Sequence, residues 1–264
     1  MKVYLKSYSR ISPLHPDPDY KSMFSMMEAR RMSKLMKRAV AVSSDALAKA
    51  GLEMPDAIVA GTGYGCIENT EAFIKSVLGL SDQPVRPTWF MQSTHNTVSS
   101  LIAIRLGCHG YNSTYSHSTV SFESALLDAF LQIGLGDIDT ALVGAFEEST
   151  EGFCDILEKA GNSRARVGGE PSFTAAAFVL SSDPAGAVCE VEDVHISRRG
   201  GLPAMEGTVI ARDSYIEKYG DNLSVSALGA CDAAELLVSG EAGRVTIVNE
   251  SEGRPSAYIR LAAI

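Results

Sequence analysis

Residues 110–147 of this sequence read GYNSTYSHSTVSFESALLDAFLQIGLGDIDTALVGAFE. Residues 111–118 are rich in Ser, Thr and Tyr and contain no apolar run, which predicts a polar strand. Apolar residues then recur at helical spacing over residues 122–133, and a short apolar run at 140–143 predicts a buried strand. The stretch therefore predicts a strand, a sharp turn, a helix and a second strand.

The turn places Ser118 and Thr119 at the start of the helix, where hydroxyl side chains act as caps. A residue at such a turn is expected to be exposed at the helix N-terminus, where free N–H groups and the helix dipole favour negative charge. Enzymes that form thioesters place their cysteine at this kind of position. Ser118 and Thr119 are therefore the first candidates for a catalytic side chain.

The same stretch resembles the β-ketoacyl synthases of the thiolase superfamily. Members of that family show a G-P-N segment, then S-T-A-C at the turn, a helix, and a strand that ends in G-G-x-E. The matching segments follow one another without a gap: Gly110-Tyr111-Asn112, Ser116-His117-Ser118-Thr119 and Gly144-Ala145-Phe146-Glu147. The resemblance implies an α/β, thiolase-like layered fold of helices and mixed β-sheets. It also places Thr119 where the family has its nucleophilic cysteine.

Length and composition fit a globular protein. A chain of 264 residues can bury roughly three quarters of its unfolded surface. The net charge of −9 argues against nucleic acid or an anionic membrane as a partner. It is also unfavourable for docking an acidic carrier protein unless basic residues cluster. No run approaches the length of a membrane span, and the first residues, MKVYLKSYSR, predict a strand rather than a signal peptide.

The five cysteines indicate a reducing compartment. Their number is odd, and no CxxC or other metal-binding spacing occurs. This pattern predicts a cytoplasmic protein with mostly buried thiols and no metal site.

A basic, amphipathic helix is predicted over residues 28–49, with Gly51 as its end. It contains Arg30-Arg31 and a second basic group, Lys34, Lys37 and Arg38. These residues could form an ordinary solvated face. They could also dock an acidic carrier protein or a partner subunit.

The segment Gly61-Thr62-Gly63-Tyr64-Gly65 follows a predicted buried strand at residues 56–60. It lacks the G-x-G-x-x-G spacing of dinucleotide-binding loops, and no acidic residue follows a second strand at the expected distance. It matches instead a glycine-rich loop that turns beneath the active site of the synthases. No cofactor is therefore expected.

Two histidines are candidates for supporting a nucleophile. His95 lies in the first turn of a helix predicted over residues 93–106, after a loop at 86–92. His117 lies next to the predicted turn, and strand alternation would direct His117 and Thr119 to the same face. Each could equally hydrogen-bond locally, and His95 could simply cap its helix.

The chain divides into two unequal halves on this interpretation, residues 1–185 and 186–264. Thiolase-like folds contain two similar halves, so the second half would be strongly shortened. The family's H-G-T-G-T segment and the histidine of its G-H-x-x-G-A turn are both absent, and Asn222 or Ser224 stands near the position of the latter. A turn at residues 165–171 precedes a buried strand at 173–181, and the family has a phenylalanine near the acyl chain there.

These absences govern the functional interpretation. Condensation needs a low-pKa thiolate and two histidines, whereas a threonine hydroxyl would need an adjacent base. The resemblance therefore implies a non-condensing subunit, similar to a chain-length factor, of the kind found in fatty-acid, polyketide or aryl-polyene synthesis. The alternatives are an active 3-oxoacyl synthase, an acyltransferase or hydrolase using Thr119 or Ser118, and a scaffold with no acyl contact.

The expected partners follow from the same resemblance. A catalytic ketosynthase would form a heterodimer with this chain, or a second copy a homodimer, through the polar strand at 111–118. An acyl carrier protein would deliver the acyl chain. A cysteine at position 119 is expected to accept an acyl group without restoring condensation.

Overall fold

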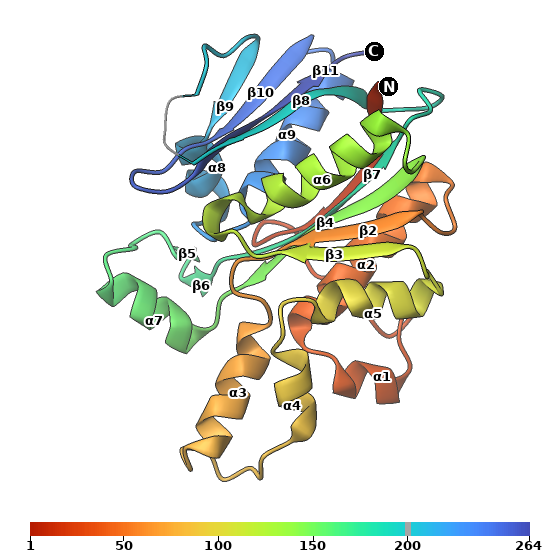
Figure 1. The fold of residues 1–264 in the computed structure, drawn as a ribbon. Coiled ribbons are helices and arrows are strands. Elements are labelled where there is room, and N and C mark those ends of the chain that lie inside the picture. Colours follow the sequence, from red (N-terminus) through yellow and green to blue (C-terminus); the bar gives the residue numbers. More distant parts are fainter. Residues whose placement is uncertain (199–201) are drawn as a thin grey trace.

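The computed structural model describes residues 1–198 and 202–264 (Figure 1). The strands are β1 (Val3–Ile11), β2 (Ala57–Gly61), β3 (Tyr111–Tyr115), β4 (Thr140–Glu148), β5 (Arg166–Val167), β6 (Glu170–Pro171), β7 (Phe173–Ser181), β8 (Cys189–Ser197), β9 (Thr208–Ala211), β10 (Arg244–Asn249) and β11 (Ser256–Ala262). The helices are α1 (Met26–Arg31), α2 (Lys34–Ala50), α3 (Ile67–Val77), α4 (Pro87–Gln92), α5 (Thr97–Leu106), the 3₁₀ turn η1 (Ser118–Val120), α6 (Ser121–Leu135), α7 (Glu151–Lys159), α8 (Arg212–Tyr219) and α9 (Ser226–Val238).

One large mixed sheet organises the molecule, so the expected α/β class is confirmed. It has nine strands in the order β3-β2-β4-β7-β1-β8-β11-β10-β9, and β5 and β6 form a separate two-stranded ribbon. β3 and β9 are the two edge strands of this sheet.

The two halves of the sheet repeat one pairing pattern. In the first half, β2 pairs with β4 in parallel, and β4–β7 and β7–β1 are antiparallel. In the second half, β9 pairs with β10 in parallel, and β10–β11 and β11–β8 are antiparallel. β3 extends the first half beyond β2, while the described residues provide no equivalent strand beyond β9. The second half is thus the shorter one, and its boundary between residues 185 and 186 stays a prediction supported by this repeat.

The sheet halves lie in layers with helices between and beside them. β1 and β8 join the halves through only three residue pairs, Val3–Leu5 with Cys189–Val191. Figure 1 shows α6 and α9 between the halves, with α2 and α5 on the other face of the first half. α6 contacts β8 of the second half, and α9 contacts β1 of the first. The shared core therefore holds the turn at residues 116–120, between β3 and α6, against both halves. This turn is called the elbow below.

Several sequence predictions of helices need correction. The helix expected over residues 28–49 is two helices, because Ser33 caps a new helix at Met36 N–H. The loop expected at residues 86–92 is the helix α4, since Pro87 is suited to a first helical turn. The helix expected from residue 93 begins only at Thr97. His95 therefore lies in the turn between α4 and α5.

Neither a membrane-spanning helix nor a metal-binding cluster occurs among the described residues. Among residues 1–198 and 202–264, no helix is both long and apolar enough to cross a membrane. Within the same residues, no group of three or more His, Cys, Asp or Glu side chains could hold a metal ion.

Gly61 tests the packing that places the elbow on the sheet. A Cβ at this position would lie 2.5 Å from the Ser121 carbonyl oxygen and 2.6 Å from the Phe122 nitrogen. Because both neighbours are backbone atoms, we expect Gly61→Ala to lower the free energy of unfolding by about 3 kcal/mol in urea titrations.

Gly134→Ala is the matched control inside α6. The nearest atom to a Cβ there is 3.9 Å away. This change should therefore alter the free energy of unfolding by no more than about 1 kcal/mol, in the stabilising direction if at all. Equal effects of the two substitutions would contradict the close packing of Gly61 beneath the elbow.

Candidate functional site

The elbow between β3 and α6 turns at Ser118. The strand ends at Tyr115, three residues earlier than predicted, and Ser118 has a φ of 54°. This left-handed conformation is unfavourable for a residue with a side chain, and Ser118 is the non-glycine residue that adopts it in the described chain. The Ser118 side chain is exposed. Ser118, rather than Thr119, is therefore the residue presented at the surface of the elbow.

Thr119 lies inside the protein. It is 0% exposed, and its Oγ1 atom has no hydrogen-bond partner among the described residues. Its carbonyl oxygen accepts a hydrogen bond of 2.6 Å from Asn249 Nδ2, which also donates to Glu123 Oε1 at 2.7 Å. The prediction that position 119 is exposed at the helix N-terminus is wrong, because the 3₁₀ turn η1 rotates Thr119 into the core.

A buried polar network backs the elbow. Burial raises the pKa of Glu123, against the hydrogen bond from Asn249. Arg212 donates to Asn249 Oδ1 at 2.6 Å and to Asp221 Oδ1 at 2.6 Å. Asn249, which lies in the second half of the chain and 130 positions from Thr119, thus fixes the Thr119 backbone by its hydrogen bond.

His117 does not face Thr119 as strand alternation predicted. The strand has already ended, so His117 is exposed while Thr119 is buried. His117 Nδ1 lies 3.0 Å from Ser124 Oγ, and the His117 N–H donates to Ser121 Oγ at 2.9 Å. Both contacts are local to the start of α6.

His95 approaches the elbow region without reaching Ser118. Its Nε2 atom lies 3.2 Å from the Gly63 carbonyl oxygen, which also accepts a hydrogen bond of 3.3 Å from Ser116 Oγ. No hydrogen bond within the described residues joins Ser118 Oγ to either His95 or His117. The four candidate residues are therefore close in the chain or the fold, but they form no relay.

Glu147, at the end of the expected G-x-x-E segment, is the charged group at the centre of the site. It is 0% exposed, and the glycine-rich loop binds it. Gly63 N–H donates to Oε2 at 2.6 Å and Tyr64 N–H to Oε1 at 2.9 Å. Thr62 and Ser224 hydroxyls add longer bonds of 3.4 and 3.3 Å. The N–H donors of the loop are thus used by a carboxyl group of the chain itself.

The positions near the missing histidine serve this same cluster. Ser224 Oγ bonds Glu147, and Asn222 Oδ1 accepts from Thr174 Oγ1 at 3.0 Å and from Ser224 N–H at 3.1 Å. Asn222 and Ser224 are 3% and 0% exposed. Both side chains therefore connect β4 and β7 to the segment before α9. Sequence reasoning did not assign Glu147 a role, although an acidic residue directly after a buried strand was a usable signal.

The basic residues before and within α2 have separate roles. Arg38 is buried, donates to both carboxylate oxygens of Asp17, and lies 3.4 Å from the centre of the Phe173 ring. Arg30 and Arg31 are exposed at the end of α1. With Arg86, which stacks over Trp89, they line one cavity of about 230 Å³.

Most of the cysteines are buried thiols, which disfavours the thiolate form. Cys66, Cys154, Cys189 and Cys231 are buried and Cys108 is half-buried. Burial raises the pKa of both the Cys189 and the Cys231 thiol to about 12. Such thiols stay protonated at neutral pH.

A comparison with family models finds one described as "Beta-ketoacyl synthase, N-terminal domain", which matches residues 9–202. Among solved structures, a type II polyketide-synthase acyl-carrier protein in complex with its hexaketide-bound ketosynthase gives a TM-score of 0.80 at 15% identity, covering 100% of this chain and 99% of that chain. The ishigamide ketosynthase/chain length factor gives 0.76 at 16%, covering 100% of both chains. The ketosynthase ApeO in complex with its chain length factor ApeC, from Xenorhabdus doucetiae, gives 0.75 at 12%, covering 100% and 98%.

Among curated proteins, none matches the sequence. At these identities the solved structures establish the fold, and the expected thiolase-like arrangement is confirmed.

The exposure of the elbow predicts where an introduced thiol reacts. We expect Ser118→Cys to be labelled by iodoacetamide and acylated by acyl thioesters, since its side chain lies at the surface near a helix start. Against the expectation from the sequence that a cysteine at position 119 accepts an acyl group, Thr119→Cys should stay unlabelled and unacylated while the protein is folded, because position 119 is 0% exposed. Intact-mass spectrometry against the wild-type chain measures both. Rapid labelling at position 119 would contradict the geometry of the elbow.

The buried carboxyl groups predict a dependence of stability on pH. Burial raises the pKa of Glu147 to about 7, although hydrogen bonds from Gly63 and Tyr64 oppose the shift. The contribution of Glu147 to stability is therefore fully present below its unfolded pKa and is lost as the pH rises through about 7. Glu147→Gln should reduce the loss of unfolding free energy between pH 4.5 and 8 by up to about 3 kcal/mol. The exposed Glu170, changed to Gln, should leave the slope as it is. Equal slopes for Glu147→Gln and the wild type would refute this assignment.

Proposed function

This chain belongs to the β-ketoacyl synthase family, and we propose that it is a non-condensing member of it, similar to a chain-length factor. In this role it pairs with a catalytic ketosynthase in fatty-acid, polyketide or aryl-polyene synthesis. An acyl carrier protein serves the pair, and we place the complex in the cytoplasm, where the free thiols stay reduced.

The state of the elbow carries this proposal. Thr119, at the position of the family's cysteine, is buried, and its carbonyl is held by Asn249. Ser118 is exposed, and among the described residues neither His95 nor His117 forms a hydrogen bond with its hydroxyl. A serine or threonine hydroxyl needs an adjacent base to act as a nucleophile. Acyl transfer through this elbow therefore has no activated group.

The region of the missing histidine supports the same conclusion. Enolate stabilisation in a condensing enzyme requires donors aimed at the reacting oxygen. Here Asn222 and Ser224 are buried and bonded to Thr174 and Glu147. These bonds use Asn222 Oδ1 and Ser224 Oγ within the fold, while Asn222 Nδ2 is buried and has no hydrogen-bond partner among the described residues.

The edge strand β3 supports a partner of the same fold. Its side chains are used within the chain: Tyr111 donates to Asp128, and Asn112 donates to the Ser99 carbonyl. Thr114 Oγ1 lies 2.8 Å from Ser99 Oγ. The outer backbone edge is left for another strand, and an uncovered edge favours pairing between chains. The comparison structures include pairs of a ketosynthase with its chain length factor, and we propose an equivalent pairing here.

The exposed arginines suit the acidic carrier protein. Arg30, Arg31 and Arg86 lie around one cavity beside Trp89. A local basic group of this kind overcomes the unfavourable net charge of −9 at short range.

The alternatives make different demands. An active synthase, or an acyltransferase or hydrolase on Thr119 or Ser118, needs a base or thiolate at the elbow. A scaffold without acyl contact needs neither a catalytic partner nor a carrier protein. The experiment below separates all three.

The test measures condensation as the release of carbon dioxide when carrier protein loaded with a malonyl group is mixed with carrier protein loaded with an acyl chain. The chain alone should give no turnover, because its elbow lacks an activated nucleophile. A catalytic ketosynthase encoded beside it should copurify with it and turn over faster in the complex. Thr114→Pro in β3 should abolish copurification, since it removes a backbone donor from the edge strand.

The matched control is Val209→Pro in β9, the other edge of the same sheet, which should leave copurification intact. Circular dichroism verifies that both variants fold. Turnover by the chain alone that disappears in Ser118→Ala or Thr119→Ala would establish the enzyme alternative. Failure of the chain to copurify with the synthase would favour the scaffold alternative.

A further inference from the structure

We propose that the cavity between α2, β4 and β7 binds a small zwitterion, with its carboxylate at Arg38 and its ammonium group at Glu148. The proposal is independent of the assignment as a synthase-like subunit, because the cavity lies apart from the four elbow candidates.

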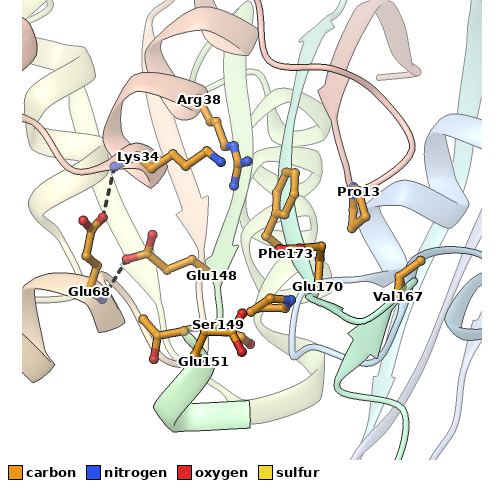
Figure 2. Close-up of a pocket in the computed structure, with 12 residues that line it drawn as sticks. Pro13, Lys34, Arg38, Glu68, Glu148, Ser149, Glu151, Val167, Glu170 and Phe173 are labelled. Carbon is orange, nitrogen blue, oxygen red and sulfur yellow. Dashed lines mark hydrogen bonds between the residues drawn. The ribbon is translucent and has the colours of Figure 1, made fainter.

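The cavity has a volume of about 510 Å³, which is within the usual range for small-molecule sites. Figure 2 shows Lys34 and Arg38 entering from α2 on one side and Glu148 from the end of β4 on the other. Phe173, Pro13 and Val167 form an apolar wall. The cavity therefore combines opposite charges with a surface for an aliphatic group.

Arg38 is a fixed, buried cation. It is 6% exposed, and its Nε and Nη2 atoms donate to Asp17 at 2.7 and 3.0 Å. Burial alone would raise the pKa of Asp17, but hydrogen bonds from Arg38 and Tyr20 lower it to about 2. The Arg38 side chain also lies 3.4 Å from the centre of the Phe173 ring. Its Nη1 group has no hydrogen-bond partner among the described residues and remains available to a carboxylate.

Glu148 is the buried group of opposite charge. It is 5% exposed, and Oε1 accepts one bond of 3.1 Å from the Glu68 N–H. Oε2 has no hydrogen-bond partner within the described residues. Burial raises the pKa of Glu148 to about 7, and a single backbone donor does not offset the loss of water. Arg38 and Glu148 line the same cavity without forming an ion pair.

Two buried, opposite charges that do not meet are best satisfied by a molecule that carries both signs. Glu148 accepts only one described hydrogen bond, and Arg38 keeps its Nη1 group free beside its ion pair with Asp17. A ligand with both charges would add charge-assisted hydrogen bonds to these two groups. Nearby carboxyl groups, Glu68 and Glu170, disfavour a ligand that is only an anion. The apolar wall favours an aliphatic amino acid over a polar one.

The experiment is isothermal titration calorimetry at pH 7.5 on the full chain with four probes. L-leucine and 5-aminopentanoate carry both charges at short and long separation. 3-Methylbutylamine and 4-methylpentanoate are leucine without its carboxylate and without its ammonium group. We expect at least one zwitterion to bind, and both single-charge analogues to bind at least about tenfold more weakly than the tighter-binding zwitterion or not at all.

Glu148→Gln keeps the size of the side chain and removes its charge, so it should weaken zwitterion binding about tenfold or more. Glu53→Gln, an exposed position that does not line this cavity, is the matched control and should bind as the wild type does. Thermal melting verifies that both fold.

Three results would overturn the proposal. They are the absence of binding by both zwitterions, binding of 3-methylbutylamine as tight as that of the tighter-binding zwitterion, and unchanged zwitterion binding by Glu148→Gln. Absence of binding would show that the cavity is not a zwitterion site. Tight binding of the amine would show that Arg38 does not bind a carboxylate, and unchanged binding by the variant would show that Glu148 does not bind the ammonium group.

Discussion

The carboxyl group of Glu147, held by the backbone of the glycine-rich loop, is the interaction on which the site depends. Its two oxygens accept the N–H groups of Gly63 and Tyr64, and Ser224 approaches from the second half of the chain. One side chain at the end of β4 thus fixes the loop after β2 and the segment before α9. Because the carboxyl is fully buried, these donors cannot be replaced by water without exposing the junction of the two halves.

The closed elbow follows from the same junction. Gly61, just before the loop, packs against the backbone at Ser121 and Phe122, so the start of α6 has one fixed position. Asn249 then reaches Thr119 and Glu123 from the second half. These bonds connect buried groups to one another. Thr119, which the sequence resemblance predicts at the position of the family's cysteine, lies in the core.

Sequence patterns predicted the elements around the elbow better than the elbow itself. The polar strand, the helix α6 and the buried strand β4 follow from residue type and period, which are local properties. The left-handed conformation of Ser118 and the burial of Thr119 do not follow from these patterns. A short 3₁₀ turn stands where the strand was expected to continue, and it changes which of the two side chains is exposed. The bond from Asn249 joins residues 130 positions apart, and no local pattern records it. α3, α8 and β9 were also not predicted. The amphipathic pattern of α8 is weak, whereas that of α3 is about as strong as that of α2 and was missed.

The central claim is that this chain functions by joining a catalytic partner along β3. Hydrogen–deuterium exchange of the amides of residues 111–115 tests it most directly, with the chain alone at low concentration and again with the neighbouring ketosynthase. The account predicts slower exchange in this strand when the synthase is present, while the amides of β9 at the opposite edge stay unchanged. Identical exchange in β3 with and without the synthase would contradict it.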